Sequence, residues 1–173
     1  IRDAVELSEH SFAEHVRVLG ANNHRALNAR HVLATCYLAA ESIDLALSHA
    51  NQAVSDCSRI LGGKHRYTLA AQANLAACHL ARGNESALAL AREAAMNHER
   101  ELGPGHHNTI RAQTIMIRCL RGAGLFDEAL AEAQRAAVNA DRWLGTQHPR
   151  SVAVKAELDE MSVPGLHPRR ATN

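Results

Sequence analysis

Leu61-Gly62-Gly63-Lys64-His65-Arg66-Tyr67-Thr68-Leu69 is the stretch that decides the fold. Its Leu-Gly pair recurs at residues 19–20, 102–103 and 144–145, so the intervals are 42, 41 and 42 residues. A histidine follows each pair, and an apolar residue that opens a helical pattern follows each histidine; the histidines are His24, His65, His106 and His148. A fixed period of this length indicates a repeat protein whose units stack on one another.

Each period contains two helical patterns. The first shows helical spacing at Leu69, Ala73, Ala76 and Leu80, and it ends at Gly83, a residue type favoured at helix C-termini. The second stops at the turn sequence Leu102-Gly103-Pro104-Gly105. We therefore expect helices at residues 2–18, 25–40, 43–60, 66–82, 85–101, 107–122, 126–143 and 149–161. The outer two lack a hairpin partner and no Met starts the chain, so we expect a fragment of a longer protein.

A helical hairpin cannot bury its apolar face alone, so the hairpins must stack. The predicted fold is all-α: a right-handed superhelical α-solenoid of antiparallel helix hairpins over residues 1–161. The composition agrees, because 46% of the residues are hydrophobic but only 3% are aromatic, and alanine supplies much of the apolar count. Residues 162–173 contain two prolines, two arginines and few apolar side chains, so we expect a disordered tail there.

The linker motif resembles that of a known repeat family. The run from Leu61 to Leu69, with Asn74-Leu75-Ala76 and Gly83 after it, is similar to the long tetratricopeptide repeat (TPR) of kinesin light chains. It is even more similar to the repeat arrays of actinobacterial regulators and nucleotide-binding signalling proteins, which share a Leu-Gly-x-x-His-Pro-x-Thr linker. The Gly-x-x-x-Glu-Ala corner of these repeats is present at residues 124–129. The sequence departs from the pattern at Glu41, where glycine is expected.

Several other classes of function are excluded by composition and spacing. A net charge of +1 does not favour nucleic acid binding, and no run of 18 apolar residues spans a membrane. We find no phosphate loop and no catalytic constellation, so we expect neither an enzyme nor a cofactor. One histidine per repeat cannot converge on a metal, because packed helices lie roughly 8–10 Å apart.

The cysteines are expected to be structural. Cys36, Cys78 and Cys119 share one repeat position, where the same separation prevents disulfide formation and core packing is favoured. The sequence decides nothing about Cys57. Reduced thiols are typical of a cytoplasmic protein.

The resemblance implies a binding groove lined by the first helix of each hairpin. By register, the groove residues are Asn28, His31, Thr35, Ala70, Ala73, Asn74, Ala77, Arg111, Thr114, Arg118 and Arg121. The three arginines share one helical face and could hold a carboxylate or phosphate, or could be a solvated charged face. The lysine and asparagine clamp of chaperone-binding relatives is absent.

The predicted function is a protein-protein interaction module that binds a peptide or protein segment, as the sensor or scaffold part of a larger regulatory protein. Another domain of the parent chain could be the occupant. Two alternatives remain open at this point. One is a self-assembly element whose ends stack, and the other is a receptor for a small signalling peptide or ligand, although few aromatic residues are available to build its pocket.

Overall fold

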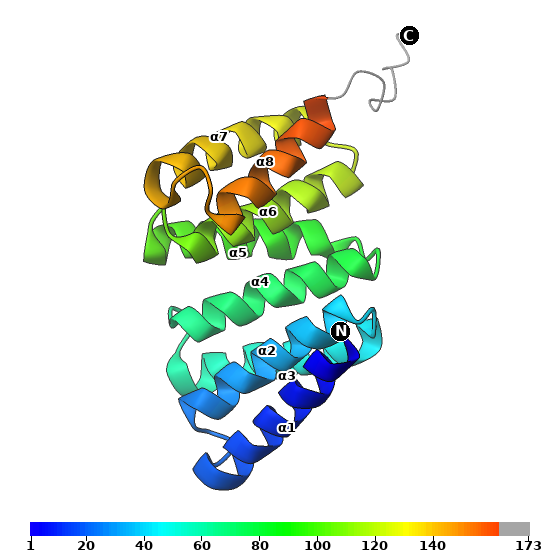
Figure 1. Ribbon diagram of the computed structural model, residues 1–173, viewed down its shortest axis with the longest axis vertical. Coiled ribbons are helices and arrows are strands. Elements are labelled where there is room, and N and C mark those ends of the chain that lie inside the picture. Colours follow the sequence, from blue (N-terminus) through cyan, green and yellow to red (C-terminus); the bar gives the residue numbers. More distant parts are fainter. Residues whose placement is uncertain (163–173) are drawn as a thin grey trace. The chain divides into compact units, whose positions relative to one another are not determined.

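The computed structural model describes residues 1–162, and over this range it contains α-helices and no strand (Figure 1). The helices are α1 (Arg2–Leu19), α2 (His24–Ala39), α3 (Ile43–Leu61), α4 (Arg66–Ala81), α5 (Ser86–Leu102), α6 (His107–Gly122), α7 (Phe126–Leu144) and α8 (Pro149–Ser162). Every boundary lies within one residue of the expected one. Ser162 ends α8, and the rest of the expected tail lies outside the described residues.

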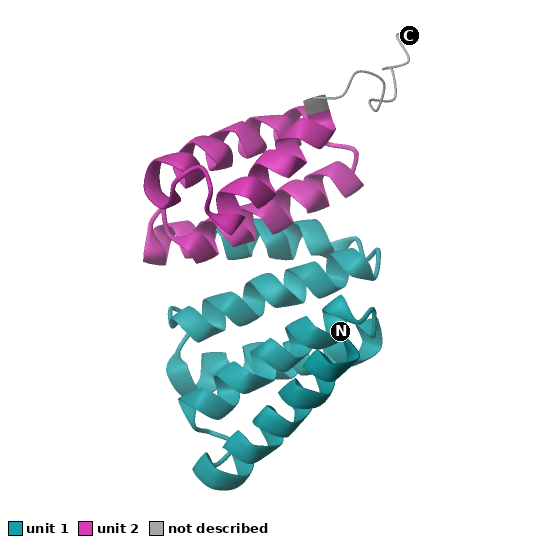
Figure 2. Cartoon of the chain, viewed as in Figure 1, with its two compact units in different colours: residues 1–97 teal, residues 98–173 magenta. Residues whose placement is uncertain are grey.

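The chain divides into two compact units, residues 1–97 and residues 98–173 (Figure 2). We call α2, α4, α6 and α8 the A helices, and α1, α3, α5 and α7 the B helices. In the first unit, α1 packs on α2, α2 on α3 and α3 on α4, and α2 also packs on α4. In the second unit, α6, α7 and α8 repeat this scheme, with α6 packing on α8. Within its unit, α2 therefore contacts both its hairpin partner α3 and the next A helix α4, and α6 contacts both its hairpin partner α7 and the next A helix α8.

The linker motif works as a pair of helix caps. Gly62 ends α3 with a φ of 87°, a conformation that side chains disfavour. His65 begins α4, and its Nδ1 accepts a hydrogen bond from the Tyr67 amide at 3.2 Å. The Thr68 hydroxyl then donates to the Gly62 carbonyl at 2.8 Å. These bonds satisfy backbone groups that the two helix ends leave without partners.

The expected role of the linker histidines at helix starts is confirmed for three of them. His106 and His148 cap α6 and α8 as His65 caps α4, with Nδ1 accepting from the amide two residues further on at 3.2 and 3.1 Å. The first linker differs, because Asn23 is the capping residue and its Oδ1 accepts from the Arg25 amide at 2.9 Å. His24 is the first residue inside α2.

The B helices contribute mainly alanine to the core, and the A helices contribute the larger side chains. The buried faces of the B helices consist almost wholly of alanine, at positions 46, 50 and 53 of α3 and 129, 133, 136, 137 and 140 of α7. The A helices supply the larger buried side chains, among them Leu27, Leu69, Ile110 and Ile117. Small residues let the B helices approach closely, and each large side chain contributes roughly 1.5–3 kcal/mol through its burial. The alternation explains how a chain with so few aromatic residues forms a core.

The corner between A and B helices requires a left-handed residue. Gly83 and Gly124 occupy it with φ values of 71° and 74°. In the first full repeat Glu41 takes the same conformation, with a φ of 57°. The departure seen in the sequence therefore leaves the backbone path unchanged and places a strained residue at the corner.

The four cysteines are free thiols. Cys78 and Cys119 are buried, as the packing interpretation predicts, and burial raises the pKa of Cys119 to about 11. Cys36 is only half-buried, and its Sγ lies 3.0 Å from the Ser8 hydroxyl. Cys57 is also buried, and its pKa is likewise raised to about 11, chiefly by desolvation. Protonated thiols of this kind pack as small apolar groups.

Candidate functional site

Three of the predicted groove residues meet between α2 and α4. Asn74 of α4 is buried, with only 2% of its surface exposed. Its Nδ2 lies 2.8 Å from the Thr35 hydroxyl and 2.7 Å from Nδ1 of His31, and it also donates to the His31 carbonyl at 3.2 Å. The amide is thus directed at α2, and the cluster joins two neighbouring A helices.

The predicted arginine face also meets a neighbouring A helix. Arg118 Nε donates to Glu157 of α8 at 2.5 Å, and Arg121 Nη1 donates to the other oxygen of the same carboxylate at 2.6 Å. Arg121 also pairs with Glu160 at 2.8 Å. Burial acts to lower the pKa of Arg121, but the hydrogen bonds to Glu160 and Glu157 outweigh it and raise that pKa. Two arginines therefore hold a carboxylate that belongs to this chain, and binding of a ligand by the same face stays a prediction.

The two contacts occupy the same place in the repeat. Glu157 stands two repeats after Asn74, and Arg118 stands two repeats after Thr35. In each unit a polar residue near the middle of one A helix is thus bonded to the preceding A helix. We call these contacts the inter-repeat pins. Glu157 was not predicted as a partner, although its register with Asn74 is visible in the sequence.

The remaining predicted groove residues differ in access. Ala70, Ala73 and Thr114 are buried, and the Thr114 hydroxyl donates to the Ile110 carbonyl at 2.9 Å. Ala77 and Arg111 are half-buried. Asn28 is also half-buried and lines a cavity of about 320 Å³ between α1 and α2. The polar groove residues therefore expose more surface to a ligand than the groove alanines do.

A second cavity lies beside the arginines of the second unit. It measures about 500 Å³ and is lined by Arg118, Arg121, Gly122, Phe126, Glu157 and Glu160. The Arg118 side chain is 55% exposed, while that of Glu157 is 5% exposed. One edge of the guanidinium is thus held by Glu157, and the rest of this side chain faces solvent next to an aromatic ring.

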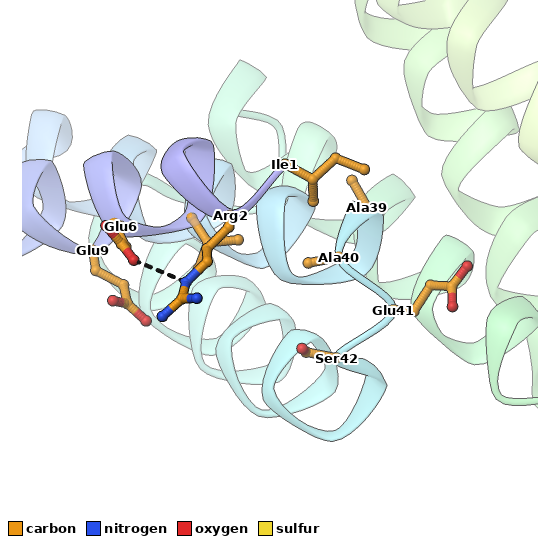
Figure 3. A pocket seen from close by; sticks show the side chains of 9 residues that line it. Ile1, Arg2, Glu6, Glu9, Ala39, Ala40, Glu41 and Ser42 are labelled. Atoms are coloured by element: carbon orange, nitrogen blue, oxygen red, sulfur yellow. Dashed lines mark hydrogen bonds and ion pairs between the residues drawn. The ribbon is translucent and has the colours of Figure 1, made fainter.

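A third cavity, of about 520 Å³, lies where the start of α1 meets the corner between α2 and α3 (Figure 3). Arg2 lies beside Glu6 there, with Nε 3.3 Å from Oε1, and Glu41 lies at the opposite side. Glu9 accepts a hydrogen bond from the Tyr37 hydroxyl at 2.5 Å, which raises the pKa of Tyr37 to about 12. This cavity was not predicted; the only signal for it was the exceptional residue at position 41.

Two further observations concern metal sites and membrane-spanning helices. Within residues 1–162, no three His, Cys, Asp or Glu side chains lie close enough together to hold a metal ion. None of the helices in this range combines the length and apolar content needed to cross a bilayer.

Comparisons with known proteins identify the fold. No family model matches the chain, and no curated protein matches it in sequence. Among solved structures, the chain is similar to the nearly identical TPR-like repeats of a Podospora anserina protein described as a kinesin light chain. The TM-score is 0.70 at 25% identity, and the match covers 92% of this chain and 76% of that one. A single-substitution variant of the same protein gives a TM-score of 0.72 with the same identity and coverage.

The predicted fold class is therefore confirmed: the chain is a TPR-like α-solenoid. Repeats of this fold generally mediate protein interactions and are typically non-enzymatic scaffolds. The similarity supports the kinesin-light-chain-like part of the resemblance and does not extend to the actinobacterial signalling proteins.

Proposed function

We propose that this chain binds an acidic segment of a partner protein, and that the exposed part of Arg118 with the cavity beside Phe126 forms the principal contact. The observation that supports the proposal is the contact with Glu157, in which the two guanidinium groups bind one carboxylate at 2.5 and 2.6 Å. A guanidinium has five donors, so one that is bonded along one edge can still bind a second acceptor.

The cavity gives the segment a place for an apolar side chain. Phe126 lines it together with Gly122, while Arg118, Arg121, Glu157 and Glu160 provide charged groups around it. A carboxylate next to an apolar residue is the combination that such a lining would recognise, because the charged groups orient the ligand and the apolar part contributes burial. Asn28, His31 and Thr35 are proposed as a second contact for a longer segment, since each keeps some exposed surface.

We also propose the wider setting suggested by the linker motif. The similar solved structures are described as kinesin light chain repeats, and the motif resembles arrays in larger regulatory proteins. A scaffold or sensor part of a regulatory protein, acting in the cytoplasm, is consistent with both.

The test is a binding measurement with defined peptides. A peptide library is selected on the wild-type chain, and the affinity of the best peptides is measured by fluorescence anisotropy for wild type and for Arg118→Gln. We expect the selected peptides to be acidic and the substitution to weaken them about tenfold or more, as for loss of one charge-assisted hydrogen bond.

The matched control is Arg142→Gln. Arg142 is also exposed, but it lies over the Trp143 ring on α7, 5.3 Å from the ring centroid and away from the cavity. Circular dichroism melting of both variants controls for folding. If acidic peptides bind Arg118→Gln as tightly as wild type, the proposed contact is wrong.

A further inference from the structure

The edge at which α6 and α8 begin carries four side chains that are cationic or can become so. His106 and His107 stand at the start of α6, and His148 and Arg150 stand at the start of α8. The rings of His106 and His107 are stacked, with their centroids 4.4 Å apart. All four residues belong to the second unit. We call them the cationic edge.

The repeat shows that these two helix starts face each other. In the first unit, Tyr67, the second residue of α4, lines one cavity with Arg25 and Asn28 of α2. The second residue of this A helix therefore faces the beginning of the preceding A helix. Arg150 is the second residue of α8 and the equivalent of Tyr67, and α8 packs on α6. We therefore place Arg150 against the beginning of α6.

The charges at these helix starts agree with this placement. Desolvation lowers the pKa of His107, and the charges of His106, Arg150 and His148 lower it further. Each of these groups is a cation or becomes one on protonation, so the edge concentrates positive charge. A bound anion would relieve the repulsion between them.

Arg150 is the residue of this edge that most needs a partner. It is half-buried, and its guanidinium makes no hydrogen bond or ion pair with any residue between 1 and 162. Burial accordingly lowers the pKa of Arg150. Arg121 of the same unit is also half-buried, but two glutamates hold it. A partly desolvated guanidinium without a counter-ion raises the free energy of the folded chain, and an anionic ligand would offset that cost.

The two capping histidines offer hydrogen-bond donors at the same edge. Nδ1 of His106 and Nδ1 of His148 each accept a hydrogen bond from a backbone amide, so these nitrogens carry no proton. A neutral imidazole then has its proton on Nε2. Each cap therefore fixes an Nε2–H donor, and neither donor has a hydrogen-bond partner in the part of the chain that the structure describes.

The exposure of this edge is a property of the repeat. His107 is exposed and His106 is half-buried although α7 and α8 follow them in the chain. Tyr67, the equivalent of Arg150, is half-buried although α5 follows it. The end of α8 is also distant, because Ser162 stands twelve residues after Arg150, roughly 18 Å along the helix.

We propose that the cationic edge binds the phosphate group of a phosphorylated side chain on a partner protein. A phosphate monoester carries roughly two negative charges and three acceptor oxygens at neutral pH. The Arg150 guanidinium can bind two of these oxygens in parallel, and the Nε2–H groups of His106 and His148 supply two more donors. A carboxylate, with one charge and two oxygens, would satisfy fewer of them. A protein is the favoured carrier because repeats of this fold generally mediate protein interactions.

The cationic edge is distinct from the proposed contact at Arg118. Arg118 stands eleven residues after His107 on α6, roughly 16 Å along the helix axis. The phosphate site can therefore be tested, and can fail, independently of the acidic-segment contact.

The first measurement titrates inorganic phosphate into the ¹⁵N-labelled chain at neutral pH and constant ionic strength, followed by NMR. We expect the backbone amides of residues 106–108 and 150–151 to shift together and to saturate, with a dissociation constant on the order of 1 mM. The start of α2 has the same cap geometry without the cluster of histidines, and its amides should not saturate. Equal shifts at both helix starts would mean that a helix N-terminus alone accounts for the effect, and would overturn the proposal.

The second measurement uses one variant and its matched control. Arg150→Gln should weaken phosphate binding about tenfold or more, because it removes a charge-assisted pair of donors. Arg25→Gln removes the same charge at the equivalent position of α2, and it should bind phosphate like wild type. Circular dichroism melting verifies that both variants fold. Equal affinities of Arg150→Gln and wild type overturn the site.

The third measurement identifies the carrier of the phosphate. A library of phosphoserine peptides is selected on the wild-type chain, and the best peptides are compared with their unphosphorylated forms by fluorescence anisotropy. We expect the phosphorylated forms to bind about tenfold tighter or more, and Arg150→Gln to abolish most of this difference. Vesicles that contain phosphatidylinositol 4-phosphate should not bind. Equal affinity for both peptide forms, or binding to the vesicles alone, overturns the assignment to a phosphorylated protein.

Discussion

Replacing Glu41 by glycine should stabilise this protein. Glu41 holds the left-handed corner between α2 and α3 with a φ of 57°, where the equivalent corners have Gly83 and Gly124. Its side chain is exposed and makes no hydrogen bond or ion pair with any residue between 1 and 162. The substitution therefore removes backbone strain without removing a native interaction.

The expected change in the free energy of unfolding is the difference between two opposing contributions. A non-glycine residue in the left-handed region costs about 1–2 kcal/mol, and glycine costs about 0.4–1 kcal/mol more than another residue through the entropy of the unfolded chain. We expect a net gain of about 0.5–1 kcal/mol. For a chain of this length that corresponds to a rise in melting temperature of about 1–4 °C.

Urea denaturation followed by far-UV circular dichroism measures the change. Gly83→Ala and Gly124→Ala are the matched controls, because a Cβ added at either position meets no atom within 4 Å. The loss of stability in these two variants therefore reports the backbone conformation alone. It should be similar in size to the gain from Glu41→Gly and opposite in sign. A lower stability for Glu41→Gly would refute the reasoning and would show that the carboxylate contributes to the folded state.

Other predictions concern single interactions, each measured by the same denaturation assay. Gln113 is fully buried, and neither of its amide atoms has a hydrogen-bond partner among residues 1–162, so Gln113→Met should stabilise by about 1 kcal/mol; a loss of stability would indicate a partner such as bound water. His65→Ala should cost about 1 kcal/mol through loss of the cap of α4, and His65→Asn should recover most of it, unless the imidazole contributes by packing. Thr68→Val should lower the free energy of unfolding by about 1 kcal/mol because the hydroxyl bonds to Gly62. Ser151→Ala should be nearly neutral, because Ser151 Oγ is buried and has no partner in the described part of the chain; equal losses would contradict this. Burial lowers the pKa of His49 below 6.5, so its imidazole binds a proton more readily in the unfolded chain than in the folded one. The free energy of unfolding should therefore fall as the pH drops through about 6.5, and the fall should be smaller in His49→Gln. An equal fall in the variant would assign the pH dependence to other groups.

The linker motif explains why the helix boundaries could be predicted from the sequence. Local hydrogen bonds of the motif fix both ends, as with His65 on the Tyr67 amide and Thr68 on the Gly62 carbonyl. Such contacts depend only on neighbours in the chain. The exchange of roles between Asn23 and His24 shows the limit of the motif, because both residue types can accept at a helix start and the spacing alone did not choose between them.

The candidate site was less predictable because it depends on contacts between repeats. Register placed His31, Thr35 and Asn74 on the A helices correctly, but it did not reveal the offset by which Asn74 reaches the preceding helix. The arginine face was identified as able to hold a carboxylate, yet Glu157 was not recognised as the group it holds. Sequence periodicity predicts which residues share a face, and the crossing of neighbouring helices decides which of them touch.

The inter-repeat pins help the units of this chain to pair with the correct neighbour during folding. Units of similar sequence can stack on the wrong neighbour and give misassembled products, a failure typical of repeat arrays. In this chain the first unit joins its A helices through an amide on a hydroxyl and an imidazole, and the second joins them through a carboxylate on two guanidinium groups. A mismatched pairing would set Glu157 against Thr35 and would leave this covered carboxylate without its two guanidinium partners. The two different polar contacts thus distinguish units that are otherwise similar. Exchanging the contact residues between the two units should increase the population of misassembled chains during refolding.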